Sequence, residues 1–239
     1  MSELPSGYRD IPEDDRKKAQ AFFEQGKRVA DAGQFEYAIS MYLQGLDKDP
    51  ENTEAHQQLR DISLKRKATG GKDLGFMEKM KLKKSSKEDK ENLLNAEKLL
   101  AYNPGDRATM LAFAVAAHKA GFYDSAMWIG KITHEANITE PKGPDFNTFI
   151  TLRDIYKSLH AWQEAVDSCS WAAKLKPDDM DLQKELKDLG AQLTMHRGKY
   201  ESGKSFRESV KDMAGQRKLM VSDSDVRTID MLQQQIMES

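Results

Sequence analysis

The sequence has a single cysteine, no long apolar run and no strong excess of either charge. Cys169 has no second thiol to pair with, so an internal disulfide and a cysteine-rich zinc site are both excluded. The first residues lack the basic and apolar regions of a signal peptide, and no later stretch approaches a membrane span. The formal net charge of -2 gives no global attraction to nucleic acid or to an anionic membrane. We therefore expect a cytoplasmic protein whose charged contacts are local.

A seven-residue phrase recurs three times along the 239 residues. Residues 32–38 read AGQFEYA, residues 120–126 read AGFYDSA, and residues 159–165 read LHAWQEA. Each copy has a small or turn-tolerant residue, an aromatic residue two positions later, and a closing alanine. Because apolar residues recur at helical spacing around these phrases, each copy predicts the hinge of a helical hairpin.

The first hairpin has the residue order of a known repeat. Its characteristic residues are Phe22, Gly26, Gly33, Phe35, Ala38, Tyr42, Gly45 and Pro50. This order resembles the tetratricopeptide repeat, a unit of two helices and 34 residues. The resemblance implies an all-α fold, a right-handed superhelical array of antiparallel helix pairs. It also implies a non-enzymatic scaffold that binds protein partners.

The spacing between the copies locates two insertions. Ala38 and Ala126 are separated by two 34-residue repeats and 20 further residues, and Pro50 and Pro104 by one repeat and the same 20 residues. Ala126 and Ala165 are separated by one repeat and 5 further residues. The larger insertion therefore lies within the second repeat, and the smaller one lies between the third and fourth.

This register divides the chain into three parts. We expect a flexible arm over residues 1–15, about four hairpins with a capping helix over residues 16–197, and a polar, partly disordered tail over residues 198–239. The capping helix is predicted from a leucine stripe, Leu182, Leu186, Leu189 and Leu193. A shorter stripe predicts a terminal helix over residues 225–237. That helix can dock on the array, on a second copy as a homo-oligomer contact, or on a partner.

The larger insertion, at about residues 66–87, is the one strongly basic region. Between Lys65 and Lys90 ten basic residues stand against four acidic ones. Apolar residues are interleaved with the lysines, namely Leu74, Phe76, Met77, Met80 and Leu82. The insertion therefore predicts either an amphipathic helix that contacts a partner or acidic surface, or a segment packed on the array. The contact residues expected in the first case are Lys79, Lys81, Lys83 and Lys84.

One motif suggests chemistry and is not supported by its context. Residues 198–205 read GKYESGKS and match the P-loop pattern for nucleotide phosphates. No apolar strand precedes the motif, and a P-loop needs a strand and a parallel sheet to present its amides. We interpret the match as chance, and keep nucleotide binding as a third hypothesis. The histidines have no metal-binding spacing and Cys169 falls at a core position, so we expect no metal, no cofactor and no catalytic residue.

The tetratricopeptide resemblance also implies a binding site. In that family ligands lie in a concave groove lined by the first helix of each repeat. The positions that match are Phe23, Lys27, Leu111, Val115, His118, Ile150 and Asp154. Phe23 and Lys27 stand where some family members have the lysine and asparagine that bind a peptide carboxyl terminus, so that mode is not expected.

Two alternatives remain open for function. The groove can instead be filled by the chain's own tail or insertion. The lysine-rich insertion can instead bind nucleic acid, as in a ribosome-associated protein, in which case the binding should fall steeply with salt.

Overall fold

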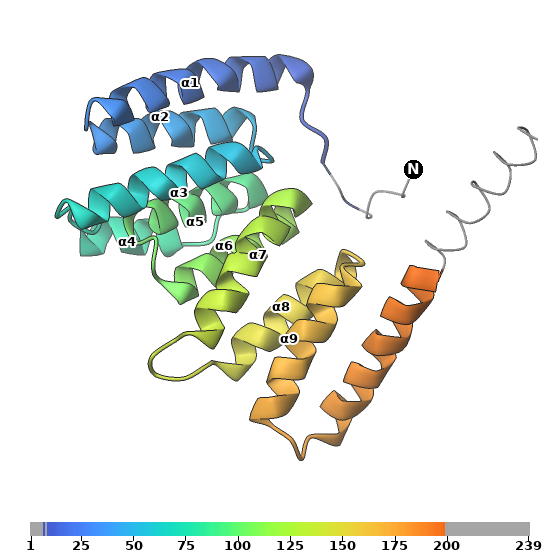
Figure 1. Ribbon diagram of the computed structural model, residues 1–239. Coiled ribbons are helices and arrows are strands. Elements are labelled where there is room, and N and C mark those ends of the chain that lie inside the picture. Colours follow the sequence, from blue (N-terminus) through green and yellow to red (C-terminus); the bar gives the residue numbers. More distant parts are fainter. Residues whose placement is uncertain (1–6, 8, 199–239) are drawn as a thin grey trace, which may run out of the picture. The chain divides into compact units, whose positions relative to one another are not determined.

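The computed structural model describes residue 7 and residues 9–198, and this part of the chain is helical throughout (Figure 1). In chain order the helices are α1 (Glu13–Asp31), α2 (Phe35–Lys48), α3 (Thr53–Ala68), α4 (Phe76–Lys83), α5 (Asp89–Tyr102), α6 (Arg107–Ala120), α7 (Tyr123–Ile138), α8 (Phe146–Ser158) and α9 (Trp162–Leu175). A further helical segment covers residues 180–198. The predicted all-α fold is confirmed.

The helices form a succession of tetratricopeptide-like hairpins. Short hinges join α1 to α2, α6 to α7, and α8 to α9, and the two helices of each pair pack along their lengths (Figure 1). In the second pair the partners are α3 and α5, and the connection between them contains α4. The insertion expected in the second repeat is therefore an ordered segment with its own helix.

The three hinges share one backbone feature. Gly33 and Gly121 have φ values of 77° and 79°, in the left-handed region that glycine enters without strain. His160, which replaces glycine in the third hinge, has a φ of 56° and stacks on Trp162 with 5.4 Å between ring centroids. The third hinge therefore keeps the same turn although a histidine is a costly residue there.

Two glycines allow the first hairpin to pack closely. A Cβ atom on Gly26 of α1 would lie 2.7 Å from the ring of Tyr42, and one on Gly45 of α2 would overlap the ring of Phe23. The rings of Phe23 and Tyr42 stack between the helices with 5.7 Å between centroids. The small residues of the repeat pattern are thus the places where each helix accommodates an aromatic ring of the other.

Side-chain caps define where three of the helices begin. Asn52, Asp106 and Asp145 each accept a hydrogen bond from the backbone amide three residues later, at 2.9, 2.9 and 2.7 Å. Such caps satisfy amides that have no partner inside the helix. They explain why α3, α6 and α8 begin directly after these residues.

The first helix begins earlier than expected, at Glu13 instead of Arg16. Pro12 occupies its N-cap position, and three acidic residues in the first turn complement the helix dipole. The segment before the helix is also packed. Ile11 is buried, and the amide of Arg9 donates to the carbonyl of Gly121 at 3.0 Å.

The core consists of three adjoining clusters. One lies between α1, α2 and α3, and its largest members are Phe23, Ile39, Tyr42, Leu46 and Leu59. A second is built mainly by α5, α6 and α7, with Leu93, Leu100, Met110, Phe113 and Ile129. The third joins α8 and α9 to the segment after them, with Phe149, Leu152, Tyr156, Leu182 and Leu189.

The chain divides into two compact units, residues 1–189 and residues 190–239. In the first unit Leu182 and Leu189 are buried against α8 and α9. The GKYESGKS motif beyond Gly198 and the terminal helix expected over residues 225–237 lie outside the described residues. Among the helices that are described, none is long and apolar enough to cross a membrane.

Candidate functional site

A cavity of about 650 Å³ lies along α5 and α6, beside the end of the insertion. Its apolar lining comes from all three elements and comprises Leu82, Ala96, Leu99, Ala108, Leu111, Ala112, Val115 and Ala116. The cavity is open to solvent along one side, and its volume suits side chains of a bound peptide. We call this cavity and its rim the α5–α6 groove.

Charged residues surround the α5–α6 groove. Its lining includes Lys83 and Lys84 from the insertion and Lys119 from α6, together with Asp89 of α5 and Asp106 before α6. Asp106 already accepts hydrogen bonds from the amide and the hydroxyl of Thr109, because it caps α6. Its carboxylate keeps its charge but is held at the helix N-terminus, and the rim as a whole carries three lysines against two aspartates.

The first end of the insertion is held by a buried arginine. Arg66, at the end of α3, donates to the carbonyl of Lys72 and to a carboxylate oxygen of Glu36 at 2.5 Å. Its guanidinium also lies over the ring of Tyr102, 4.4 Å from the centroid. Burial, followed by the hydrogen bond to Glu36, raises the pKa of Tyr102 to about 12, so its hydroxyl stays protonated.

The other end of the insertion is held by hydrogen bonds to α5. The amide of Ser86 donates to Asn92 at 2.7 Å, and the side-chain amide of Asn92 donates back to the carbonyl of Ser86 at 3.0 Å. Between the two ends, Glu78 of α4 pairs with Lys98 of α5 at 2.8 Å. The insertion is therefore fixed at both ends and in its middle.

The structure brings together some of the predicted site residues. Leu111 and Val115 share the α5–α6 groove with Lys83 and Lys84. The basic insertion and the third repeat thus contribute to one surface, which the repeat pattern alone did not indicate.

The remaining predicted groove residues lie elsewhere. Phe23 and Lys27 line a separate cavity of about 200 Å³ between α1 and α3, and most of the Phe23 ring is in the core. Ile150 and Asp154 line a third cavity, of about 350 Å³, beside the segment that begins at residue 179. His118 lies on α6 and its Nε2 atom is 2.6 Å from the hydroxyl of Ser158.

The other two insertion lysines differ from each other. Lys79 is 3.6 Å from Asp73 and is partly buried, whereas Lys81 is exposed. Lys81 is therefore the one that remains available to a partner.

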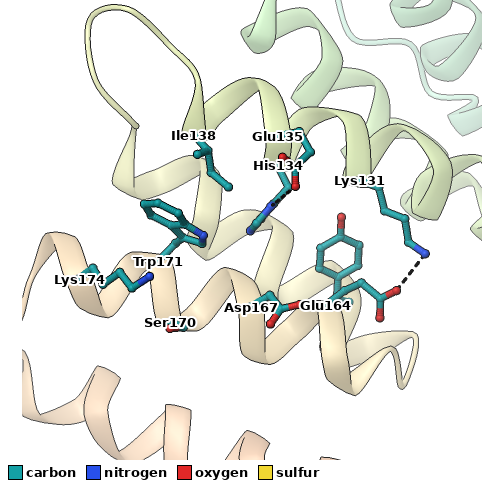
Figure 2. A pocket seen from close by; sticks show the side chains of 10 residues that line it. Lys131, His134, Glu135, Ile138, Glu164, Asp167, Ser170, Trp171 and Lys174 are labelled. Atoms are coloured by element: carbon teal, nitrogen blue, oxygen red, sulfur yellow. Dashed lines mark ion pairs between the residues drawn. The ribbon is translucent and has the colours of Figure 1, made fainter.

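A further cavity, of about 410 Å³, lies between α7 and α9 and was not expected from the sequence (Figure 2). Lys131 reaches Glu164 across it at 2.9 Å, and the ammonium group of Lys174 lies 4.3 Å from the centre of the Trp171 ring. Both lysines of this cavity therefore already have a partner, one a carboxylate and the other an aromatic ring.

A buried polar network joins α3, α5 and α7. The Nδ1 atom of His56 is 3.2 Å from a carboxylate oxygen of Glu97, and its Nε2 atom is 3.2 Å from the hydroxyl of Ser125. The imidazole ring stacks on Trp128 with 5.4 Å between centroids and meets the edge of Phe113. These contacts link helices that belong to two different hairpins.

The order serine, histidine, carboxylate has the connectivity of a nucleophilic triad, but the surroundings do not suit that chemistry. All three side chains are buried, and the Ser125 hydroxyl donates to the carbonyl of Pro50 at 2.7 Å. A nucleophile must be open to its substrate, and this one is enclosed. The network is therefore a structural contact between hairpins.

Burial lowers the pKa of His56, but the Glu97 carboxylate opposes it most strongly. The Pro50 carbonyl and Glu51 add to that effect, and the pKa is raised above its ordinary value of 6.5. His56 and Glu97 thus form a buried ion pair when the imidazole is protonated. Sequence reasoning missed the network because His56 and Ser125 are 69 residues apart, with no local pattern that connects them.

Comparison with known proteins adds little to these observations. No family model and no curated protein matches the chain. Among solved structures, the chain is similar to the crystal structure of MamA protein, with 13% identity, coverage of 75% of this chain and 85% of that one, and a TM-score of 0.37. A tetratricopeptide repeat protein from Parabacteroides merdae gives 14% identity, coverage of 74% of both chains and a TM-score of 0.35.

A thermophilic tetratricopeptide protein of Thermus thermophilus gives 15% identity, coverage of 72% of this chain and 98% of that one, and a TM-score of 0.30. Likenesses at this level carry no inference about function. The functional argument therefore rests on the surfaces of the chain itself.

Proposed function

We propose that this protein is a non-enzymatic interaction scaffold that binds a peptide segment of a protein partner in the α5–α6 groove. The observation that carries the proposal is the groove itself. Its lining contains a continuous set of apolar side chains from α5 and α6, and its rim carries three lysines against two aspartates. A peptide that buries apolar side chains there and places carboxylates near Lys83, Lys84 and Lys119 would satisfy both features.

The remaining polar clusters do not compete with this proposal. The His56 network is enclosed, and in the described part of the chain no group of histidine, cysteine and carboxylate side chains is arranged to hold a metal ion. Cys169 is buried against the segment after α9, and burial raises the pKa of its thiol. A thiol in such surroundings is not a nucleophile. Binding is accordingly the activity that the described residues support.

The proposal can be tested by selecting peptides from a displayed random library against the full chain. We expect the selected peptides to combine apolar residues with aspartate or glutamate. The Val115→Glu variant should weaken their binding by at least about tenfold, because a carboxylate in the apolar lining is desolvated and repels an acidic ligand.

Leu64→Glu is the matched control, because Leu64 is an exposed apolar residue of α3 that does not line the groove. It should leave peptide binding unchanged. Equal binding to the parent chain and to the Val115→Glu variant would show that the peptides bind elsewhere, and the proposed groove would be wrong.

A further inference from the structure

The helix of the insertion has an apolar stripe that faces solvent. Phe76, Met77 and Met80 are 76%, 80% and 55% exposed, and they are three of the eight large apolar residues that are exposed in the described chain. Phe76 and Met80 are one turn apart, so they lie on the same face of α4. The other five are distributed over α2, α3, α9 and the segment from 180 to 198, where no two lie within four residues of each other in sequence. The stripe is therefore a concentrated feature.

The stripe cannot turn inward, because the opposite side of α4 is fixed. Glu78 pairs with Lys98 of α5, and Leu82 lines the α5–α6 groove. Leu74, just before the helix, is buried. The alternative expected from the sequence, that the apolar residues of the insertion pack on the array, thus holds for Leu74 and Leu82 and not for the stripe.

The charge around the stripe is strongly positive. From Lys72 to Lys87 there are six lysines and two carboxylates. Both carboxylates are already paired, Asp73 with Lys67 and Lys79, and Glu78 with Lys98. Among the described residues, no carboxylate lies within ion-pair distance of the other five lysines, Lys72, Lys81, Lys83, Lys84 and Lys87.

We propose that α4 is an interfacial helix that binds the chain to an anionic lipid surface, with Phe76, Met77 and Met80 inserted between headgroups and the neighbouring lysines among the lipid phosphates and carboxylates. A solvent-facing apolar stripe bordered by lysines is the pattern that such helices use. It needs no shape complementarity from its partner. The stripe is exposed and lines none of the cavities described above, which favours a fluid surface over a folded or helical protein partner.

This inference is independent of the proposed peptide site. The two surfaces share the insertion as a support, but their contact residues can be changed separately. Phe76, Met77 and Met80 are outside the α5–α6 groove, whereas Val115 is inside it. A protein that binds peptide and not vesicles, or vesicles and not peptide, would identify which proposal fails.

The test is co-sedimentation of the full chain with vesicles of phosphatidylcholine alone or with about 30% phosphatidylserine, at low and at physiological salt. We expect binding to the anionic vesicles only, and weaker binding at the higher salt concentration, since headgroup attraction is screened. The Phe76→Ser, Met77→Ser, Met80→Ser triple variant should lose at least about tenfold in vesicle affinity. Because these side chains are exposed, the triple variant should keep the helical circular dichroism of the parent chain.

A matched control is Met180→Ser, since Met180 is 77% exposed and lies outside the insertion. It should bind vesicles as the parent does. Lys81→Gln with Lys87→Gln should also weaken binding to anionic vesicles, because two positive charges near the stripe are lost. Both lysines lie outside the groove, so the change does not alter the peptide site. Absence of binding to anionic vesicles, equal binding to neutral ones, or full binding by the triple variant would each overturn the proposal. So would selective binding of a single-stranded RNA probe that depends on the two lysines and not on the stripe.

Discussion

Removal of the carboxylate from the buried His56–Glu97 pair should destabilise the protein in a pH-dependent way. The side chains of His56 and Glu97 are 1% and 4% exposed, so neither charge has water to replace its partner. In Glu97→Gln the imidazole remains buried without a carboxylate beside it. Burial then favours the neutral form, and His56 must release its proton when the protein folds below its unfolded pKa.

The magnitude follows from this proton release. One pH unit below the ordinary histidine value of 6.5, the release costs about 1.4 kcal/mol, and loss of the attraction to Glu97 adds a similar amount. Near pH 5.5 we therefore expect a loss of about 3 kcal/mol, or a fall in Tm of roughly 6–12 °C for a chain of this size. Near pH 8.5 the loss should be about 1 kcal/mol or less, because neutral His56 can accept a hydrogen bond from the glutamine amide.

With rising pH, the contribution of this pair to the stability of the parent chain should decrease, whereas the Glu97→Gln variant should become more stable. A histidine whose pKa is raised by folding contributes stability fully below pH 6.5, and that contribution is lost as the pH rises through the folded value. Urea denaturation followed by far-ultraviolet circular dichroism at several pH values measures both trends.

Glu135→Gln is the control, because His134 and Glu135 form a similar pair at 3.7 Å in which the carboxylate is exposed. Glu135→Gln should lower the free energy of unfolding by less than about 1 kcal/mol at either pH. If Glu97→Gln were equally destabilising at pH 5.5 and pH 8.5, the pair would not be charged and the reasoning would be refuted.

Two further predictions concern contacts between and within hairpins. Gly45→Ala should lower the free energy of unfolding in urea by about 1–3 kcal/mol, because its Cβ would overlap the Phe23 ring. Gly190→Ala, which has nothing within 4 Å, should instead stabilise its helix by about 0.5–1 kcal/mol, and an equal effect of both changes would contradict the packing account. Asn137→Ala should lower the free energy of unfolding by about 1–3 kcal/mol and speed proteolysis within residues 139–144. The reason is that the buried side-chain amide of Asn137 forms hydrogen bonds with both the backbone N–H and the carbonyl of Asp145, at 3.0 and 2.9 Å. Unchanged proteolysis would show that the loop is held by other contacts.

The helix pattern could be predicted from the sequence because its signals are local. The hinge phrase and Pro50 bound α2, which begins at Phe35 and ends at Lys48. Asn52 is a favoured capping residue, and α3 begins directly after it at Thr53. The spacing of hinges also predicted two insertions, since a repeat of fixed length leaves any extra residues visible in the register.

Contacts between hairpins could not be predicted in the same way. The groove joins Lys83 to Val115, and the buried network joins His56 to Ser125, from repeats that no local pattern relates. The sequence also did not show which apolar residues of the insertion are buried and which are exposed. Leu74 and Met80 have the same character in sequence, yet one is buried and the other is exposed. Which side of α4 faces the array depends on where α5 places Lys98, and that is a tertiary contact.

The insertion is the part of the array where new surfaces arise at low cost to the fold. Each doubling of a loop's length costs only about 0.6 kcal/mol in closure entropy, so twenty added residues between α3 and α5 are easily tolerated. Arg66 and Asn92 then hold its two ends, and the hairpins on either side keep their own cores. Phe76 and Lys81 are exposed, so their side chains contribute little to folding. The proposed lipid surface uses these exposed side chains, and the proposed peptide groove uses Leu82, Lys83 and Lys84 at the end of the same segment.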